Sequence, residues 1–495
     1  MRNLRLSRAR QRLSGVTLAS LVALGVMVAV PGGAAAKPPT AFQLSSDPSL
    51  FPAFSESVSD YVVRCQPSNE VHVSVSTPEN AKASVDGRPQ RKGSFTQTVS
   101  LSAGQSLDVV FTKPGRNSAT YFIRCLPSDF PTFAAARTGP TQAEWYAVTP
   151  TLLAPSDVSA QYAALFDNNG VPVWWMRSAD SSIPLDFKLL PNGHVAWLHF
   201  VTGVDSTGME ERRLDGSLVR TLDTVGGPGD HHDVQLLPNG NYLMGRYAYR
   251  SGVDMSACGG SNSGALWDAE IQELTPSGEL VWSWRASDHI PVSEVTPAWA
   301  SFCTGGNGDV YHWNSVEPDG DGYVLSFRHL DAVYRIDRAT GAIDWKLGGE
   351  SRPESLTVVD DPLSAVSTFG GQHDARVLAD GSLTVHDNGT GLNRPPRGVR
   401  YAIDRSARTA TLIEDVRDTD APGSRCCGST RRLPGGNWVS AWGANPFVTE
   451  QTATGGRVFK LSFTQGLFSY RANPVLPGQL SRTALRAGMD VQYPR

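Results

Sequence analysis

From about residue 140 onward the chain repeats a short hairpin unit, and this repetition constrains the fold more than any other feature. The unit consists of an apolar residue, Asp or a polar residue, a tight turn, and a second apolar stretch that often ends in Trp. Six copies begin at Leu165, Leu214, Leu274, Ile336, Ile403 and Leu461. Their spacing is roughly 45 to 65 residues, the scale of one blade of a β-propeller.

A second unit alternates with the first and has the form strand, Pro-Asn-Gly-like turn, strand. Its copies occupy residues 188–193, 235–240, 316–320, 377–381 and 432–436. Two alternating hairpins in each repeat supply the four strands of a blade. We therefore predict an all-β chain whose residues 140–495 form a six-bladed β-propeller, with seven blades as the alternative count.

Residues 41–130 form a separate predicted unit, a small β-sandwich of the Ig/cadherin-like kind. Apolar and polar residues alternate at 71–75 and 107–111, which is the period of a half-buried strand, and Asp86-Gly87 is a hairpin signal. Residues 54–63 resemble the opening of cadherin-like sandwich domains of bacterial surface proteins.

The first 36 residues have the pattern of an export signal peptide. Five Arg precede an apolar run over 16–30, and Ala34-Ala35-Ala36 offers a small-residue cleavage site. The run is short for a membrane span of about 20 residues, although an uncleaved anchor is the alternative. We predict a secreted or extracytoplasmic protein with no transmembrane segment after signal removal.

The charge balance speaks against a nucleic-acid partner. The full chain carries 44 basic and 48 acidic residues, a net charge of −4. Removing the five Arg of the signal leaves 39 basic residues against 48 acidic ones, or −9. A protein with this balance has no global basic field.

Six cysteines, all after the signal, fit an oxidising compartment. Cys65 and Cys125 each end a similar strand pattern, so we predict that they pair within the small domain. Cys258 and Cys303 would then pair across a long loop. Cys426 and Cys427 are either a vicinal disulfide or two free thiols, and the sequence leaves both possibilities open. No Cys/His spacing indicates structural zinc.

Three histidines occupy one position of the repeat. His232 and His312 each lie six residues before the Pro of the turn, and His373 lies six residues before Ala379, which replaces that Pro. Equivalent positions in successive blades converge at one end of a propeller channel. His231 precedes His232, and strand alternation predicts that it points elsewhere. The remaining candidates receive a structural interpretation: His194, His199, His289, His329 and His386.

Arg328 lies on the predicted strand that follows the His312 turn, so it can return to the same end of the channel. A guanidinium fork beside several imidazoles is suited to binding an anion with tetrahedral or trigonal oxygens. The sequence thus predicts an anion site built from His232, His312, His373 and Arg328.

These motifs resemble those of the bacterial aryl-sulfate sulfotransferases. The resemblance covers roughly residues 140–470 and is carried by four short motifs in order: His232-Asp233, His312-Trp-Asn-Ser, Ser326-Phe-Arg-His and Gln372-His-Asp. Members of the family are exported six-bladed propellers that move a sulfuryl group between phenols without the nucleotide donor of cytosolic sulfotransferases. His386-Asp-Asn-Gly stands where the family often has Phe-Asp-Asn-Gly.

The resemblance implies roles for the individual residues. It makes His373 the nucleophile and places His312, Arg328 and His232 around the sulfuryl group, with Asn314 in substrate binding. It also implies a ping-pong exchange through a sulfohistidine, with an aryl sulfate donor, a phenolic acceptor and no cofactor. The sandwich departs from the N-terminal domain of the best-known members, so dimerisation through it does not carry over.

Two other functions fit the same residues. In-register histidines could hold iron, copper or zinc, although Arg328 disfavours a neighbouring cation and the sequence shows no clear Asp or Glu to orient the imidazoles. The chain could instead be a secreted, non-catalytic propeller that binds a glycan, a protein or a wall polymer. Substitution of His373 and treatment with a chelator separate the three hypotheses.

Overall fold

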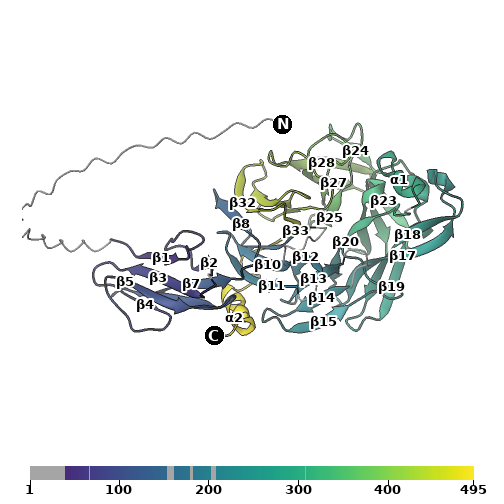
Figure 1. The fold of residues 1–495 in the computed structure, drawn as a ribbon. Coiled ribbons are helices and arrows are strands. Elements are labelled where there is room, and N and C mark those ends of the chain that lie inside the picture. Colours follow the sequence, from purple (N-terminus) through teal and green to yellow (C-terminus); the bar gives the residue numbers. More distant parts are fainter. Residues whose placement is uncertain (1–39, 66, 153–160, 179–181, 202–207, 307) are drawn as a thin grey trace, which may run out of the picture. The chain divides into compact units, whose positions relative to one another are not determined.

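A computed structural model describes residues 40–495 apart from 66, 153–160, 179–181, 202–207 and 307, so the predicted signal peptide over 1–36 lies outside the described residues. The described chain is built almost entirely of β-strands, which confirms the all-β class (Figure 1). None of its helices is long and apolar enough to cross a membrane.

The N-terminal part contains two sheets. One has the strand order β1-β3-β5 and the other β2-β7-β6-β4. The strands are β1 (Gln43–Asp47), β2 (Asp60–Arg64), β3 (Glu70–Ser76), β4 (Lys82–Val85), β5 (Ser94–Ser100), β6 (Ser106–Thr112) and β7 (Ala119–Leu126). The alternation read from the sequence appears directly in β3, where Val71, Val73 and Val75 are buried and the residues between them are not. These valines pack into a hydrophobic core shared by both sheets.

Six further sheets follow among the described residues, each with at least four strands. The first three contain β9 (Trp145–Thr151), β10 (Tyr162–Asp167), β11 (Pro172–Arg177); β12 (Ile183–Leu189), β13 (Val195–Phe200), β14 (Met209–Arg212), β15 (Leu218–Leu222); and β16 (Val234–Leu236), β17 (Tyr242–Val253), β18 (Gly264–Leu274), β19 (Leu280–Arg285). Within each of these sheets, strands that follow one another in sequence pair antiparallel.

The other three sheets continue the pattern, except that the strand Thr357–Val359 pairs parallel with the strand Thr409–Val416. They contain β20 (Trp313–Asp319), β21 (Gly322–Phe327), β22 (Ala332–Asp337), β23 (Ile343–Gly348); β24 (Thr357–Val359), β25 (His373–Val377), β26 (Leu383–Asp387), β27 (Arg397–Asp404), β28 (Thr409–Val416); and β29 (Ser429–Arg432), β30 (Trp438–Ala441), β31 (Phe447–Gln451), β32 (Arg457–Phe463). β8 (Phe133–Arg137) joins the last of them beside β32.

The end of the chain completes the first of these six sheets. β33 (Phe468–Val475) pairs antiparallel with β9, so a strand from residue 470 lies beside one from residue 148. β33 also contacts β12 and β29, β29 contacts β25, and β20 contacts β16 and β25. The edge strands β12, β16, β20, β25, β29 and β33 therefore form one connected inner set.

The turn patterns locate most of the hairpins correctly. The Pro-Asn-Gly-like units link the first two strands of five sheets, at β12–β13, β16–β17, β20–β21, β25–β26 and β29–β30. We predicted that the sixth copy of the other unit, beginning at Leu461, is a hairpin, and this prediction is wrong. It joins β32 to β33, which belong to different sheets, and the sixth hairpin is β31–β32, closed by the turn at 452–456.

A non-strand segment between β19 and β20 reaches the inner set. It contains η2 (Ala286–Asp288), η3 (Val292–Glu294), η4 (Pro297–Trp299) and α1 (Ser301–Thr304), and a Cys258–Cys303 disulfide ties it to η1 (Ser256–Cys258). The other disulfide joins Cys65 to Cys125. Cys426 and Cys427 are free thiols.

Two more helices complete the description. η5 (Arg328–Leu330) begins directly after β21. α2 (Arg482–Gln492) packs on β11, and its Arg482 and Arg486 form ion pairs with Asp60 of β2.

Candidate functional site

His232, His312 and His373 lie at the N-terminal ends of neighbouring inner strands. His232 lies two residues before β16, His312 immediately precedes β20, and His373 is the first residue of β25. The rings of His232 and His312 have their centroids 5.1 Å apart. His232 and His373 are buried, whereas His312 is partly exposed. The common repeat position thus corresponds to a common place in the sheets.

Arg328 lies directly after β21, the strand that pairs with β20. It is the first residue of η5 rather than part of the strand, and its backbone N–H donates to the His312 carbonyl at 2.9 Å. Its Nη2 donates to the Arg425 carbonyl at 2.7 Å, and its guanidinium lies 4.2 Å from the centroid of the Trp299 ring. The disulfide-tied segment therefore supplies the aromatic face on which Arg328 rests.

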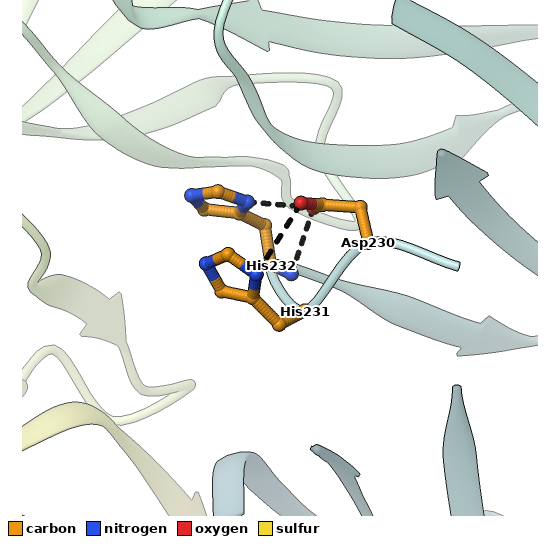
Figure 2. A group of neighbouring side chains, drawn as sticks. All are labelled: Asp230, His231 and His232. Carbon is orange, nitrogen blue, oxygen red and sulfur yellow. Dashed lines mark hydrogen bonds and ion pairs between the residues drawn. The ribbon is translucent and has the colours of Figure 1, made fainter. Parts of the chain in front are cut away.

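Asp230 orients two of the imidazoles (Figure 2). Its Oδ1 accepts from His232 Nδ1 at 2.6 Å and from the His232 backbone N–H at 2.9 Å, while its Oδ2 lies 3.5 Å from His231 Nδ1. The rings of His231 and His232 stack with centroids 4.2 Å apart. The expectation that His231 points elsewhere was therefore wrong, because these residues precede β16 and do not alternate as a strand does.

Asp309 plays the same part for His312. Its Oδ2 lies 2.6 Å from His312 Nδ1, and its backbone carbonyl accepts from His329 Nδ1 at 2.5 Å. The His329 ring stacks on that of His312 with centroids 4.4 Å apart, so this histidine, which we interpreted as structural, lies beside the site. The structure also supplies the orienting carboxylates, Asp230 and Asp309, that were not recognised in the sequence.

His373 has a different environment, with neutral partners. Its Nδ1 lies 3.0 Å from the Gly371 carbonyl and 2.9 Å from Asn388 Oδ1, both of which are acceptors. Nδ1 therefore carries the proton. Nε2 is left with its lone pair, and the backbone N–H of Cys427 donates to it at 3.1 Å.

The electrostatics keep these imidazoles neutral. Burial, followed by the charge of Arg328, holds the pKa of His373 well below its usual 6.5. Burial and the neighbouring His232 and Arg328 do the same to the pKa of His312. Burial also lowers the pKa of His231 to about 4. A neutral imidazole retains a lone pair and can act as a nucleophile, a base or a metal ligand.

The pKa values of the Asp230 and Asp309 carboxylates shift in opposite directions. Burial disfavours the charged form of Asp230, but His232 and His231 offset this effect and lower its pKa below the usual value. For Asp309 burial dominates and raises the pKa, although His329 and His232 act in the opposite direction. Burial also lowers the pKa of Arg328.

Asn314 is the second residue of β20, one of the strands of the inner set. Its Nδ2 donates to the Gln372 carbonyl at 2.8 Å, next to His373. Among the described residues its buried Oδ1 has no hydrogen-bond partner. The structure thus places Asn314 beside the predicted nucleophile with one acceptor unused.

A cluster of ion pairs lies next to the histidines, built from the same strands. We call this the charge cluster: Asp186, Lys188, Asp233, Asp374, Arg376, Arg431 and Arg471. Arg471 Nη1 contacts Asp186 at 3.0 Å and Asp233 at 3.1 Å, and Arg376 Nη2 contacts Asp233 at 2.8 Å. Burial opposes ionisation of Asp233, but Arg376, Lys188 and Arg471 hold its pKa well below the usual value.

Two groups within the site have metal-ligand chemistry. Asp230, His231 and His232 form one, and Asp309, His312 and His329 form the other, each with its ligand atoms within 4.8 Å of one another. In the second group His329 Nδ1 is a hydrogen-bond donor and Arg328 Nη1 donates to its Nε2 at 2.9 Å. Both of its nitrogens are thus engaged, so the first group is the better candidate for a cation.

Comparisons with known proteins give one family and several distant structures. The family model "Arylsulfotransferase (ASST)" matches residues 138–468. No curated protein matches. The similar solved structures include a protein of unknown function from Bacteroides caccae, at 12% identity and a TM-score of 0.42, covering 67% of this chain and 99% of that one.

Two others are a virginiamycin B lyase from Staphylococcus aureus and the Cps50 (Swd1) β-propeller domain from Myceliophteria thermophila. The lyase is 11% identical with a TM-score of 0.34, covering 67% of this chain and 99% of its own. The propeller domain is 12% identical with a TM-score of 0.35, covering 67% of this chain and 88% of its own. The family match spans well over half of the sequence, and the chain belongs to the arylsulfotransferase (ASST) family.

Proposed function

We propose that the protein transfers a sulfuryl group from an aryl sulfate to a phenolic acceptor, with His373 as the nucleophile. The observation that carries the proposal is the meeting of three imidazoles and Arg328 at one end of the inner strands, in a chain of the arylsulfotransferase family. The mechanism is a ping-pong exchange that needs no nucleotide donor and no cofactor.

The hydrogen bonds of His373 support Nε2 as the attacking atom. Nδ1 donates its proton to Gly371 and Asn388, so the lone pair is on Nε2. In the first step a bond forms between Nε2 and sulfur, and the sulfur–oxygen bond of the donor breaks to release a phenolate. In the second step a phenol attacks the sulfohistidine, and the nitrogen–sulfur bond breaks. Two displacements replace one difficult transfer.

The Arg328 guanidinium and the second N–H of Asn314 Nδ2 are donors suited to the sulfuryl oxygens, which accept hydrogen bonds. Charge spreads over three equatorial oxygens in the transition state, as in phosphoryl transfer. A positioned guanidinium stabilises that charge, and one such donor contributes about 3 kcal/mol. Asn314 lies beside His373 and holds its amide in place through Gln372.

The partners of the histidines suggest a division of roles. His232 and His312 each have a carboxylate at Nδ1, at 2.6 Å in both cases, which holds the N–H there and leaves the lone pair on Nε2 to take a proton from one phenol and return it to another. His373 has only neutral partners and stays a neutral nucleophile. His232 and His312 therefore serve as acid and base for the phenols, and Asp230 and Asp309 are positioning residues.

The domains and the location that we propose are those predicted from the sequence. We propose that the six C-terminal sheets are the blades of one propeller over 140–495 and that residues 41–130 are a sandwich domain. We also propose that 1–36 is a signal peptide removed during export. Two disulfides in the structure support an extracytoplasmic location.

The test uses purified protein and a chromogenic aryl sulfate. Release of phenolate should depend on added phenol, should resist EDTA, and should be lost in His373→Ala. Mass spectrometry of a reaction lacking acceptor should find a sulfuryl group on the peptide containing His373. Absence of acceptor-dependent release with a panel of aryl sulfates would overturn the proposal.

A metal-dependent activity is the second candidate, favoured by the Asp230, His231 and His232 group. Under this hypothesis EDTA abolishes activity, and a stoichiometric metal is found by elemental analysis. A non-catalytic binding module is the third candidate, and under it His373→Ala changes ligand affinity only.

A further inference from the structure

The residues 424–428 form a loop that touches the proposed catalytic groups through its backbone. The Arg425 carbonyl accepts from Arg328 at 2.7 Å, and the Cys427 carbonyl accepts from Asn388 Nδ2 at 2.9 Å. The Cys427 N–H donates to His373 Nε2 at 3.1 Å. Peptide groups on both sides of the Cys426–Cys427 bond thus contribute to orienting Arg328 and His373.

The same loop carries the two cysteines that are not in disulfides. Cys426 is partly exposed and Cys427 is buried. The hydrogen bond from Cys427 and the charge of Arg328 lower the pKa of Cys426, while burial raises that of Cys427. The accessible thiol is therefore the one closer to its reactive thiolate form.

A disulfide between these neighbours requires a change in the backbone. Consecutive Cα atoms lie about 3.8 Å apart across a trans peptide, below the usual Cα–Cα range of about 4.4–6.8 Å for disulfides. The two disulfides of this protein span 5.6 and 6.1 Å. Cys427 already has φ of 65°, in the left-handed region. Closing the ring must therefore rotate the peptide groups of this loop.

We propose that Cys426 and Cys427 are a thiol-modification site that controls the activity, an inference that rests on the proposed function. A small disulfide is the oxidant. The Cys426 thiolate attacks it and releases one thiol, and Cys427 then attacks the mixed disulfide and releases the second. The net change converts two protein thiols and one small disulfide into one protein disulfide and two small thiols.

Oxidation then lowers sulfuryl transfer because it moves the backbone groups that hold the site. Rotation of the loop withdraws the Cys427 carbonyl from Asn388, whose Oδ1 accepts from His373 Nδ1 and orients the ring, and it shifts the Arg425 carbonyl away from Arg328. Misplacement of reacting groups by about 1 Å lowers rates on the order of 100-fold. A strained, accessible disulfide is also more easily reduced than a structural one, so the change is reversible while the two structural disulfides persist.

The experiment treats the full-length mature protein with hydroxyethyl disulfide, then with a dithiol. Trypsin cleavage after Arg425 and Arg431 isolates both cysteines in the peptide 426–431. We expect that peptide to lose two hydrogens on oxidation, with a loss of kcat/KM on the order of 100-fold that the dithiol reverses. Cys426→Ser, compared with its own untreated sample, should show no response, whereas Cys427→Ser should stop at a mixed disulfide on Cys426 and form no ring.

Three results would overturn the inference. One is a disulfide in the peptide with unchanged activity; another is a persistent pair of alkylatable thiols after treatment. The third is a loss of activity in treated Cys426→Ser as large as that of the treated wild-type protein. If neither redox form transfers sulfuryl, the proposed function fails on its own. Amide exchange then decides the inference: faster exchange over 424–430 on oxidation supports it, and unchanged exchange contradicts it.

Discussion

The histidine site and the charge cluster are neighbours built from adjacent residues of the same strands, yet they are arranged in opposite ways. His232 and Asp233 are consecutive, as are His373 and Asp374. In the charge cluster every carboxylate meets at least one cation, and Arg471 bridges three of them. In the histidine site the lone pair of His373 Nε2 meets only the Cys427 N–H, which a substrate can displace, and the buried Oδ1 of Asn314 has no hydrogen-bond partner among the described residues. Ion pairing makes the charge cluster structural, and groups open to a substrate make the histidine site chemical.

The largest expected effect is on activity, from His373→Ala. Removal of the nucleophile should lower kcat/KM by at least about 1000-fold, measured as phenol-dependent release of phenolate. His289→Ala is the matched control, since His289 stacks on Trp284 outside the site. Acceptor-dependent turnover that survives the substitution at His373 would break the comparison.

The next largest effect is on stability, from Asp233→Asn in the charge cluster. Loss of this carboxylate leaves Arg376, Lys188 and Arg471 under-compensated in a buried place, and we expect the free energy of unfolding to fall by about 3–5 kcal/mol. Urea denaturation measures it. Asp215→Asn, at an exposed turn, should change it by no more than about 0.5 kcal/mol. Equal effects at both positions would show that the cluster is not structural.

A smaller effect is expected from Asp309→Asn, which keeps the shape of the side chain but removes the charge beside His312. Loss of a partner of this kind lowers activity by about 10- to 100-fold. The pH profile provides the readout that a packing defect would not move, because the proton affinity of His312 should fall. Asp309→Glu should restore part of the activity, and a variant with an unchanged profile would assign Asp309 to packing alone.

The smallest effect is a displacement of the acid limb of the pH profile. The pKa of His373 lies well below 6.5 because burial and Arg328 disfavour its charged form. A group with a lowered pKa is neutral above the lowered value, so activity should persist below pH 6.5 and fall only as the pH drops through that lower value. Measurements of kcat/KM across the acid range test this, and a limb centred at 6.5 or above would contradict it.

The hairpins and the histidine positions could be predicted because the sequence repeats. Turn residues recur because each sheet needs the same tight connections, so five of the Pro-Asn-Gly-like hairpins and the positions of His232, His312 and His373 follow from counting. The sixth hairpin of the other unit did not, because Leu461 has the apolar pattern of that unit, whereas the strand that follows it, β33, pairs with β9 of the first sheet and not with β32. The local sequence does not indicate that β33 pairs with β9, a strand more than 300 residues earlier in the chain.

The supporting residues of the site were harder to find. Asp230 and Asp309 stand two and three residues before their histidines, in segments without strand periodicity, so no alternation rule places them. His329 follows Arg328 directly and could have been suspected from that adjacency. Contacts made by backbone atoms, such as the Cys427 N–H with His373, leave no signal in side-chain identity.

The pairing of β33 with β9 also makes the site dependent on completion of the chain. Arg471, on β33, contacts Asp186, Asp233 and Asp374 from three different sheets. A chain lacking the last thirty or so residues would enclose three carboxylates without the cation that bridges them, in addition to losing the strand that joins the first and last sheets. The charge cluster beside the histidines is therefore complete only when β33 has paired with β9.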